Sequence, residues 1–151
     1  MNYWLLKSDV EDFSISEMQK ESRVEWVGVR NYQARNFMRD QMKLGDLALF
    51  YHSNAEPSGC AGVVRVASPA HPDSTALIKK SKYFESKATK ENPIWFCVDV
   101  EFVTQFEKFV SIADLRNNPK LADLEILKKG SRLSVTPLSE IHFKEILKMA
   151  K

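Results

Sequence analysis

The sequence contains only two cysteines among its 151 residues, and they do not form a CxxC motif. This pattern excludes a disulfide framework and favours a reducing compartment. No apolar run approaches the roughly 20 residues of a membrane-spanning helix, so we expect no membrane segment. The N-terminal residues also lack a basic lead and a long apolar core. We therefore expect no signal peptide and predict a cytoplasmic location.

The chain also lacks a large net charge of either sign. The chain has 22 basic and 20 acidic side chains, which gives a formal net charge of +2. Proteins that coat nucleic acid through phosphate contacts are far more basic, so any nucleic-acid partner must be recognised locally. Glycine is scarce, and no glycine- or serine-rich linker or repeat interrupts the sequence. We predict a single domain over residues 1–151, large enough to fold without disulfide or metal.

The hydrophobic pattern predicts short strands interleaved with short helices. The predicted strands cover residues 3–6, 47–52, 59–66, 94–103 and 132–136, the last closed by Pro137. The predicted helices start at a capping box over residues 14–17 and cover residues 31–42, 111–116 and 139–150. Because regular βαβ alternation is absent, this order is typical of an α+β domain with a mixed or mostly antiparallel, strongly curved sheet. Closure of the sheet toward a barrel fits the pattern.

The stretch 94–103 gives the clearest strand signal, because apolar residues alternate along it with a period of two. Its second face changes from Trp95 and Cys97 to Asp99 and Glu101. We therefore expect the first half of that face to be covered and the second half to be wet, with the rim of a cleft near Trp95.

Residues that could support catalysis or metal binding are few. The three histidines, His52, His71 and His142, are far apart and have no carboxylate or cysteine at ligand spacing, so we expect no metal site. The common nucleotide-binding and metalloprotease motifs are also missing, and we expect no cofactor.

Two residues have reactive side chains but an unfavourable context. Cys60 lies in an apolar strand, where burial raises the pKa of a thiol and makes it inert. Ser8 follows Lys7, a potential base, but adjacent side chains diverge and no oxyanion motif accompanies them. We expect no catalytic residue.

Aromatic and hydrogen-bonding residues are concentrated in three segments, at residues 26–32, 50–54 and 82–84. A base taken out of its stack needs aromatic faces and a few polar groups on its Watson–Crick edge. Such stacking contributes about 1 to 3 kcal/mol per base, which gives useful affinity without a basic surface. Trp26 lies outside any periodic run, and it fits a recognition role and a packing role equally well. Lysines at 79–90 and 128–129 fit either phosphate contacts or a solvated surface.

Five blocks of the sequence resemble the EVE domain and occur in the same order. They are YWLLKS at 3–8, WVGVRNYQARN at 26–36, GD at 45–46, FYHS at 50–53 and GSRLSV at 130–135. The resemblance implies a PUA-like fold, in which a curved mixed sheet closes toward a barrel with short helices around it. It also implies kinship with the YTH domain, which binds methylated adenine in RNA.

The resemblance further implies a binding module for a modified nucleobase in DNA or RNA, such as 5-methylcytosine or one of its oxidised forms. Lys7 and Ser8 would form the floor of an aromatic pocket, Trp26 one wall, and an aromatic ring from the Tyr83–Phe84 loop the other. Val10 stands where the family usually has a proline. We expect no turnover, and a monomer or weak dimer.

The candidate ligand-binding residues are Lys7, Ser8, Trp26, Val29, Arg30, Asn31, Tyr32, Tyr51, His52, Ser53, Tyr83, Arg132, Leu133 and Ser134. Among them, four are expected to contact the edge of the base: Ser8, Asn31, Tyr32 and Ser53. Arg30 or Arg132 is expected to lie near phosphate.

Two other functions stay open. The related ASCH domains share the PUA-like fold and include amidohydrolases that act on modified cytidine, so Lys7 or Glu25 would transfer protons in that case. Alternatively, the aromatic loops bind a small metabolite or another protein.

Overall fold

A computed structural model describes all 151 residues. The short apolar runs of the sequence form eight strands, and eight helical segments lie between or beside them. The strands are β1 (Tyr3–Asp9), β2 (Arg23–Glu25), β3 (Leu47–Ser53), β4 (Gly59–Val66), β5 (His71–Pro72), β6 (Phe96–Cys97), β7 (Asp99–Ser111) and β8 (Val135–Leu138). The α-helices are α1 (Ile15–Glu21), α2 (Tyr32–Asn36), α3 (Ile112–Arg116) and α4 (Glu140–Met149). The other segments are the π-helix η1 (Phe37–Gln41) and the 3-10 helices η2 (Ser74–Leu77), η3 (Pro119–Leu121) and η4 (Glu125–Leu127).

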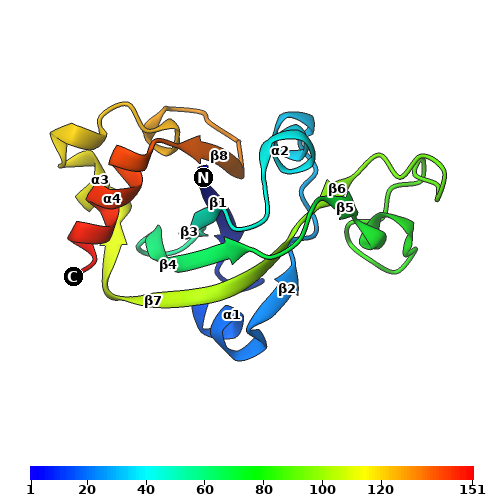
Figure 1. Cartoon of the computed structure of the whole chain (residues 1–151), viewed down its shortest axis with the longest axis horizontal. Coiled ribbons are helices and arrows are strands. Elements are labelled where there is room, and N and C mark those ends of the chain that lie inside the picture. Colours follow the sequence, from blue (N-terminus) through cyan, green and yellow to red (C-terminus); the bar gives the residue numbers. More distant parts are fainter.

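Six strands form one curled sheet in the order β2-β7-β4-β3-β1-β8, and β5 and β6 form a separate pair. Only β1 and β3 run parallel; the other neighbours are antiparallel. In Figure 1, β7 sweeps in a long curve from β6 to α3, and this curl closes the sheet halfway toward a barrel. The mixed, strongly curved sheet confirms the predicted α+β fold.

The central strands β1, β3 and β4 are buried on both faces, which explains why they are continuous apolar runs. Because side chains alternate along a strand, Trp4 and Leu6 enter one core cluster while Leu5 enters another. Side chains of α1, α2 and η1 pack on the first face, whereas α3, η3 and α4 pack on the second. No helix in the protein reaches the length and hydrophobicity needed to span a bilayer.

The strand predicted over residues 94–103 is wrong in its bounds. Ile94 has a positive φ of 64°, and the chain forms β6 and then β7, which continues to Ser111. Two register shifts between β4 and β7 break the alternation that would have marked the second half of β7. The predicted change of environment is confirmed, since Cys97 is fully buried and Glu101 is half-buried. Trp95 is 4% exposed, so this half of the face is covered as predicted, and the cavity-lining Arg30 lies 5.2 Å from its ring.

The strand predicted over residues 132–136 is also shifted. Residues 132–134 lie outside strands, and β8 includes Pro137 rather than ending before it. Proline lacks an N–H donor, but β8 is an edge strand that pairs only with β1, so no second neighbour needs that donor.

The predicted helix starts are confirmed. Ser14 and Glu17 form a reciprocal capping box at α1, and Asn31 and Ser139 cap α2 and α4. The helix predicted over residues 31–42 divides into α2 and the π-helix η1, which ends at Gln41. The predicted hairpin of β3 and β4 is present.

Candidate functional site

A cavity of about 530 Å³ opens where the end of β1, the end of β2 and the loop after η2 meet. This volume is within the range of small-molecule sites. The lining residues are Lys7, Ser8, Asp9, Asp12, Phe13, Val24, Glu25, Trp26, Val27, Gly28, Val29, Arg30, Lys82, Tyr83 and Ser134. Half of the predicted residues line this cavity, namely Lys7, Ser8, Trp26, Val29, Arg30, Tyr83 and Ser134.

The other predicted residues lie outside this cavity. Asn31 uses its side-chain oxygen to cap α2, where it accepts from the Ala34 N–H at 3.0 Å. The Tyr32 ring stacks on Trp95 outside the cavity, and the residue is 58% exposed. Leu133 lines a separate cavity beside Pro137, and Arg132 is exposed.

The predicted residues of β3 also lie elsewhere, because the strand places them on other surfaces. Tyr51 belongs to the core cluster on the opposite face of the sheet, and burial raises its pKa to about 12. His52 accepts the Ile15 N–H at Nε2 at 3.0 Å, and burial lowers its pKa. Ser53 lines a neighbouring cavity of about 450 Å³, which also contains Tyr51 and Lys7.

Trp26 follows β2 directly and forms part of the cavity wall. Its backbone N–H donates to the Val98 carbonyl at 2.9 Å, which continues the pairing of β2 past its last residue. The indole meets the Phe50 ring edge-on at 5.6 Å and 85°, and the residue is only 7% exposed. Trp26 therefore packs in the core and also lines the cavity, so the packing role is present and the recognition role stays a prediction.

The Tyr83 ring lies directly against Gly28. A Cβ at this glycine would come within 2.5 Å of the Tyr83 ring, and its φ of 87° also disfavours any other residue. Gly28 thereby allows the loop after η2 to approach the Trp26–Arg30 segment closely. The two segments form adjacent walls of one cavity.

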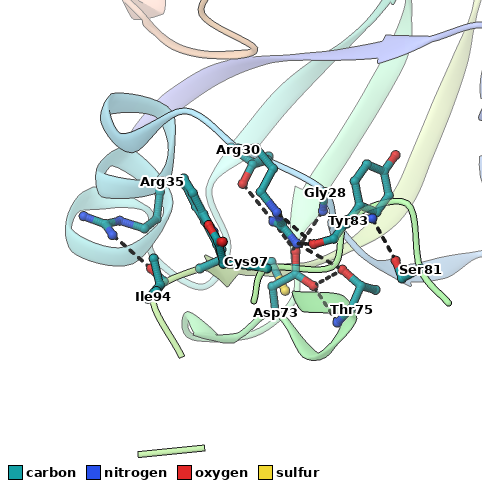
Figure 2. Close-up of polar contacts among 12 residues, drawn as sticks. Gly28, Arg30, Arg35, Asp73, Thr75, Ser81, Tyr83, Ile94 and Cys97 are labelled. Atoms are coloured by element: carbon teal, nitrogen blue, oxygen red, sulfur yellow. Dashed lines mark hydrogen bonds and ion pairs between the residues drawn. The ribbon is translucent and has the colours of Figure 1, made fainter. Parts of the chain in front are cut away.

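Asp73 is a buried anchor for both walls, although it does not line the cavity. Its side chain is fully buried and accepts from Gly28 N at 2.8 Å, Arg30 Nη1 at 3.0 Å and Thr75 N at 2.9 Å (Figure 2). Burial opposes ionisation, but hydrogen bonds from Thr75, Gly28 and Arg30 lower the pKa of Asp73 below its ordinary value. The carboxylate therefore stays ionised and fixes the segment next to Trp26.

The sequence prediction missed Asp73, since most of its partners lie more than 40 residues away. One local signal was present: an aspartate two residues before Thr75 is a typical helix cap, and its side chain does cap η2.

Arg30 is held inside this network instead of pointing to solvent. Its guanidinium makes five hydrogen bonds, to Tyr83 O through Nε and Nη2, to Val29 O and Asp73 through Nη1, and to Thr75 through Nη2. These bonds use all of its N–H donors. A phosphate contact predicted for Arg30 would have to displace them, so its role here is to tie Tyr83 to Asp73.

Charged groups surround the mouth of the cavity. Lys82 Nζ and Asp12 Oδ2 are 3.0 Å apart and join the loop after η2 to the loop after β1. Asp9 accepts from Asn54, which is the largest cause that lowers its pKa. Burial lowers the pKa of Lys7, against the effect of Glu125. The cavity thus offers both cations and carboxylate acceptors at short range.

The Ser8 hydroxyl donates to the Phe13 carbonyl at 2.6 Å. That bond takes up the hydroxyl proton, and Lys7 makes no hydrogen bond to this hydroxyl. Cys60 is also inert, because burial raises the pKa of its thiol to about 12, as predicted.

The fold brings together three residues with metal-binding side chains, Glu25, His71 and Cys97, whose ligand atoms lie within 4.8 Å of one another. Sequence spacing had indicated no such group. However, His71 Nε2 is bonded to Asp99 at 2.7 Å, and the Cys97 sulfur lies 3.8 and 3.9 Å from the two ring nitrogens. A sulfur equally far from both nitrogens faces the ring and not a nitrogen lone pair. The ring would have to turn away from Asp99 to share a cation with Cys97.

His71 should titrate above its ordinary pKa, and His52 below. Burial lowers the pKa of His71, but hydrogen bonding to Asp99 and the charge of Glu25 raise it further than burial lowers it. A raised pKa in the folded state adds stability that is complete below pH 6.5 and is lost as the pH rises through that pKa. Nuclear magnetic resonance titration measures both midpoints. A His71 midpoint below that of His52 would contradict the assignment.

Comparison with known proteins finds matches that span nearly the whole chain. The family model described as the EVE domain matches residues 2–149. Thymocyte nuclear protein 1 from Gallus gallus is 38% identical over 165 residues, which covers 97% of this chain and 68% of the relative. The crystal structure of human THYN1 protein in complex with 5-methylcytosine-containing DNA has a TM-score of 0.93 at 34% identity and covers 100% of this chain and 98% of that chain.

A more distant similarity concerns the fold alone. A YTH domain from Zygosaccharomyces rouxii, solved in complex with N6-methyladenosine RNA, has a TM-score of 0.57 at 14% identity. It covers 99% of this chain and 86% of the YTH chain. The full-length family match and the identity to thymocyte nuclear protein 1 agree with the curled six-stranded sheet. The chain therefore belongs to the EVE domain family.

Proposed function

We propose that this protein binds a modified nucleobase of DNA or RNA in the cavity lined by Trp26 and Tyr83. The observation that carries the proposal is the pairing of an indole and a phenol with polar groups in one cavity of suitable volume. A human relative with the same fold was solved with 5-methylcytosine-containing DNA, which supports this assignment. A flipped base stacks on aromatic faces and is read along its edge.

The relative solved with 5-methylcytosine-containing DNA makes modified cytosine the base we propose, and the polar groups of the cavity are compatible with it. The exocyclic amine of cytosine donates hydrogen bonds, and the carboxylates of aspartate and glutamate accept them. Asp9 and Glu25 supply carboxylates at the cavity, and Lys7 supplies a donor for a ring nitrogen or carbonyl oxygen. The near-neutral net charge of the chain agrees with recognition of one base by close contacts.

Replacing Trp26 by alanine should weaken binding of a 5-methylcytosine oligonucleotide by about 5- to 150-fold, which corresponds to the loss of about 1 to 3 kcal/mol of stacking. Titration followed by fluorescence anisotropy measures the affinities. Because Trp26 also packs on Phe50, Trp26→Phe is the control: it keeps an aromatic face and should retain most of the affinity. If wild type and Trp26→Ala are both folded and bind the oligonucleotide with equal affinity, the proposal is wrong.

The proposal includes no chemical step. Its rival is an amidohydrolase that uses Lys7 or Glu25, both of which line the cavity. Release of cytidine from an acylated cytidine by wild type but not by Glu25→Gln would favour the rival. Cytoplasmic location and a monomeric or weakly dimeric state stay predictions from the sequence.

A further inference from the structure

A row of alternating cationic and aromatic side chains leads from the wall of the cavity to the surface. Tyr83 lines the cavity, and the Arg30 guanidinium lies 5.6 Å from its ring centroid. The same guanidinium lies 5.2 Å from the Trp95 ring. Figure 2 shows Tyr83, Arg30 and Arg35 along this row. The cavity wall is therefore continuous with a second group of rings outside the cavity.

The row ends at Tyr32 on α2. Its ring stacks on Trp95 with 4.8 Å between centroids and an interplanar angle of 18°. Trp95 is buried at 4% exposure, whereas Tyr32 is 58% exposed. A buried indole thus holds an exposed phenol in a fixed orientation, with part of its ring open to solvent.

Arg35 adds a cation beside this exposed ring. Its guanidinium lies 4.8 Å from the Tyr32 ring and 5.8 Å from the Trp95 ring. Its donors bond to Ile94 O and Asn36 Oδ1, so they hold its position without neutralising its charge. The neighbouring Arg39 differs, because it forms an ion pair with Asp40.

We propose that Tyr32 and Arg35 form a second stacking site, which takes the base next to the one held in the cavity. This inference rests on the proposed function. Aromatic faces bind unpaired bases with little sequence preference, and a guanidinium beside them attracts the phosphate backbone. The stacked ring is already ordered by Trp95, so binding costs little side-chain entropy. The protein therefore engages an unpaired segment of at least two nucleotides.

The test combines a protein change with a ligand change. Wild type and Tyr32→Ala are titrated with a single-stranded DNA that contains one 5-methylcytosine, and with the same DNA carrying abasic sites on both sides of that base. With intact flanks, Tyr32→Ala should weaken binding by about 5- to 150-fold. With abasic flanks, both proteins should bind alike, because no neighbouring base remains to stack.

Two further variants serve as controls. Tyr32→Phe preserves the ring and should bind within about twofold of wild type, since stacking needs only the aromatic face. Ile141→Ala, at a residue 77% exposed on α4, controls for loss of an exposed apolar side chain. Equal affinity of wild type and Tyr32→Ala for the intact DNA would overturn the second site, as would an equal loss on both DNAs. Neither result touches the proposed function, which depends on the Trp26→Ala measurement.

Discussion

Asp73→Asn is expected to lower the free energy of unfolding by about 3 to 5 kcal/mol, the usual cost of leaving one member of a buried ion pair without its partner. One Asp73 oxygen accepts from the N–H and hydroxyl of Thr75, and the other accepts from Gly28 N and Arg30 Nη1. An asparagine has only one acceptor oxygen, so its amide N–H₂ would face a pair of donors. Base affinity should fall as well, because both cavity walls lose their anchor.

The effect of Asp73 should depend on pH in a defined direction. Its folded-state pKa lies below the ordinary value of 3.8, although burial acts the other way. A lowered pKa adds stability that is present above pH 3.8 and is lost as the pH falls through the folded-state pKa. The difference between wild type and Asp73→Asn should therefore be constant near neutral pH and shrink in acid.

Urea unfolding at several pH values measures this difference. The matched control is Asp40→Asn, which removes a carboxylate from the exposed ion pair with Arg39 and should cost less than about 1 kcal/mol. If both variants lose the same stability, Asp73 does not anchor the two cavity walls.

Gly28→Ala is expected to cost about 2 to 5 kcal/mol of stability and to move Tyr83 away from the cavity. A non-glycine residue at positive φ costs about 1 to 2 kcal/mol. The added methyl group would also meet the Tyr83 ring at 2.5 Å, and such overpacking costs about 1 to 3 kcal/mol more. Because Arg30 bonds the Tyr83 carbonyl, displacement of the ring should also disturb the guanidinium.

Gly45→Ala provides a matched control for the backbone part of this effect. Gly45 has a similar φ of 93°, but an added Cβ would meet nothing within 4 Å. It should lose about 1 to 2 kcal/mol and keep full affinity for the modified base. Equal stability losses for Gly28→Ala and Gly45→Ala, with equal affinities, would show that the Tyr83 contact does not shape the cavity.

Local features of this fold could be predicted because they depend on neighbouring residues. Caps at Ser14 and Asn31 are set by side chains that reach only three residues ahead. The bounds of β7 and β8 could not be predicted, because the length of a strand depends on pairing partners elsewhere in the chain. Exposed polar residues belong to β7 because their backbone pairs with β4. Pro137 is tolerated in β8 only because β8 is an edge strand.

The candidate site was partly predictable for a different reason. Family resemblance indicated Lys7, Ser8, Trp26 and Tyr83, and the fold brings these four into one cavity. Polar residues were harder to place, because backbone groups compete for them. The Asn31 amide caps a helix and His52 accepts a backbone N–H, so neither points into that cavity.

The position of β1 in the sheet has a consequence for how the protein is assembled during synthesis. This first strand lies between β3 and β8, with Tyr3 opposite both Leu47 and Leu138. One edge of β1 can be paired once the first third of the chain has emerged, but the other edge waits for residues near the C-terminus. Until then, a highly apolar strand keeps an open edge, which is a template for wrong pairing. The sheet around β1 therefore stays incomplete until β8 has been synthesised, although β1 is its first strand along the chain.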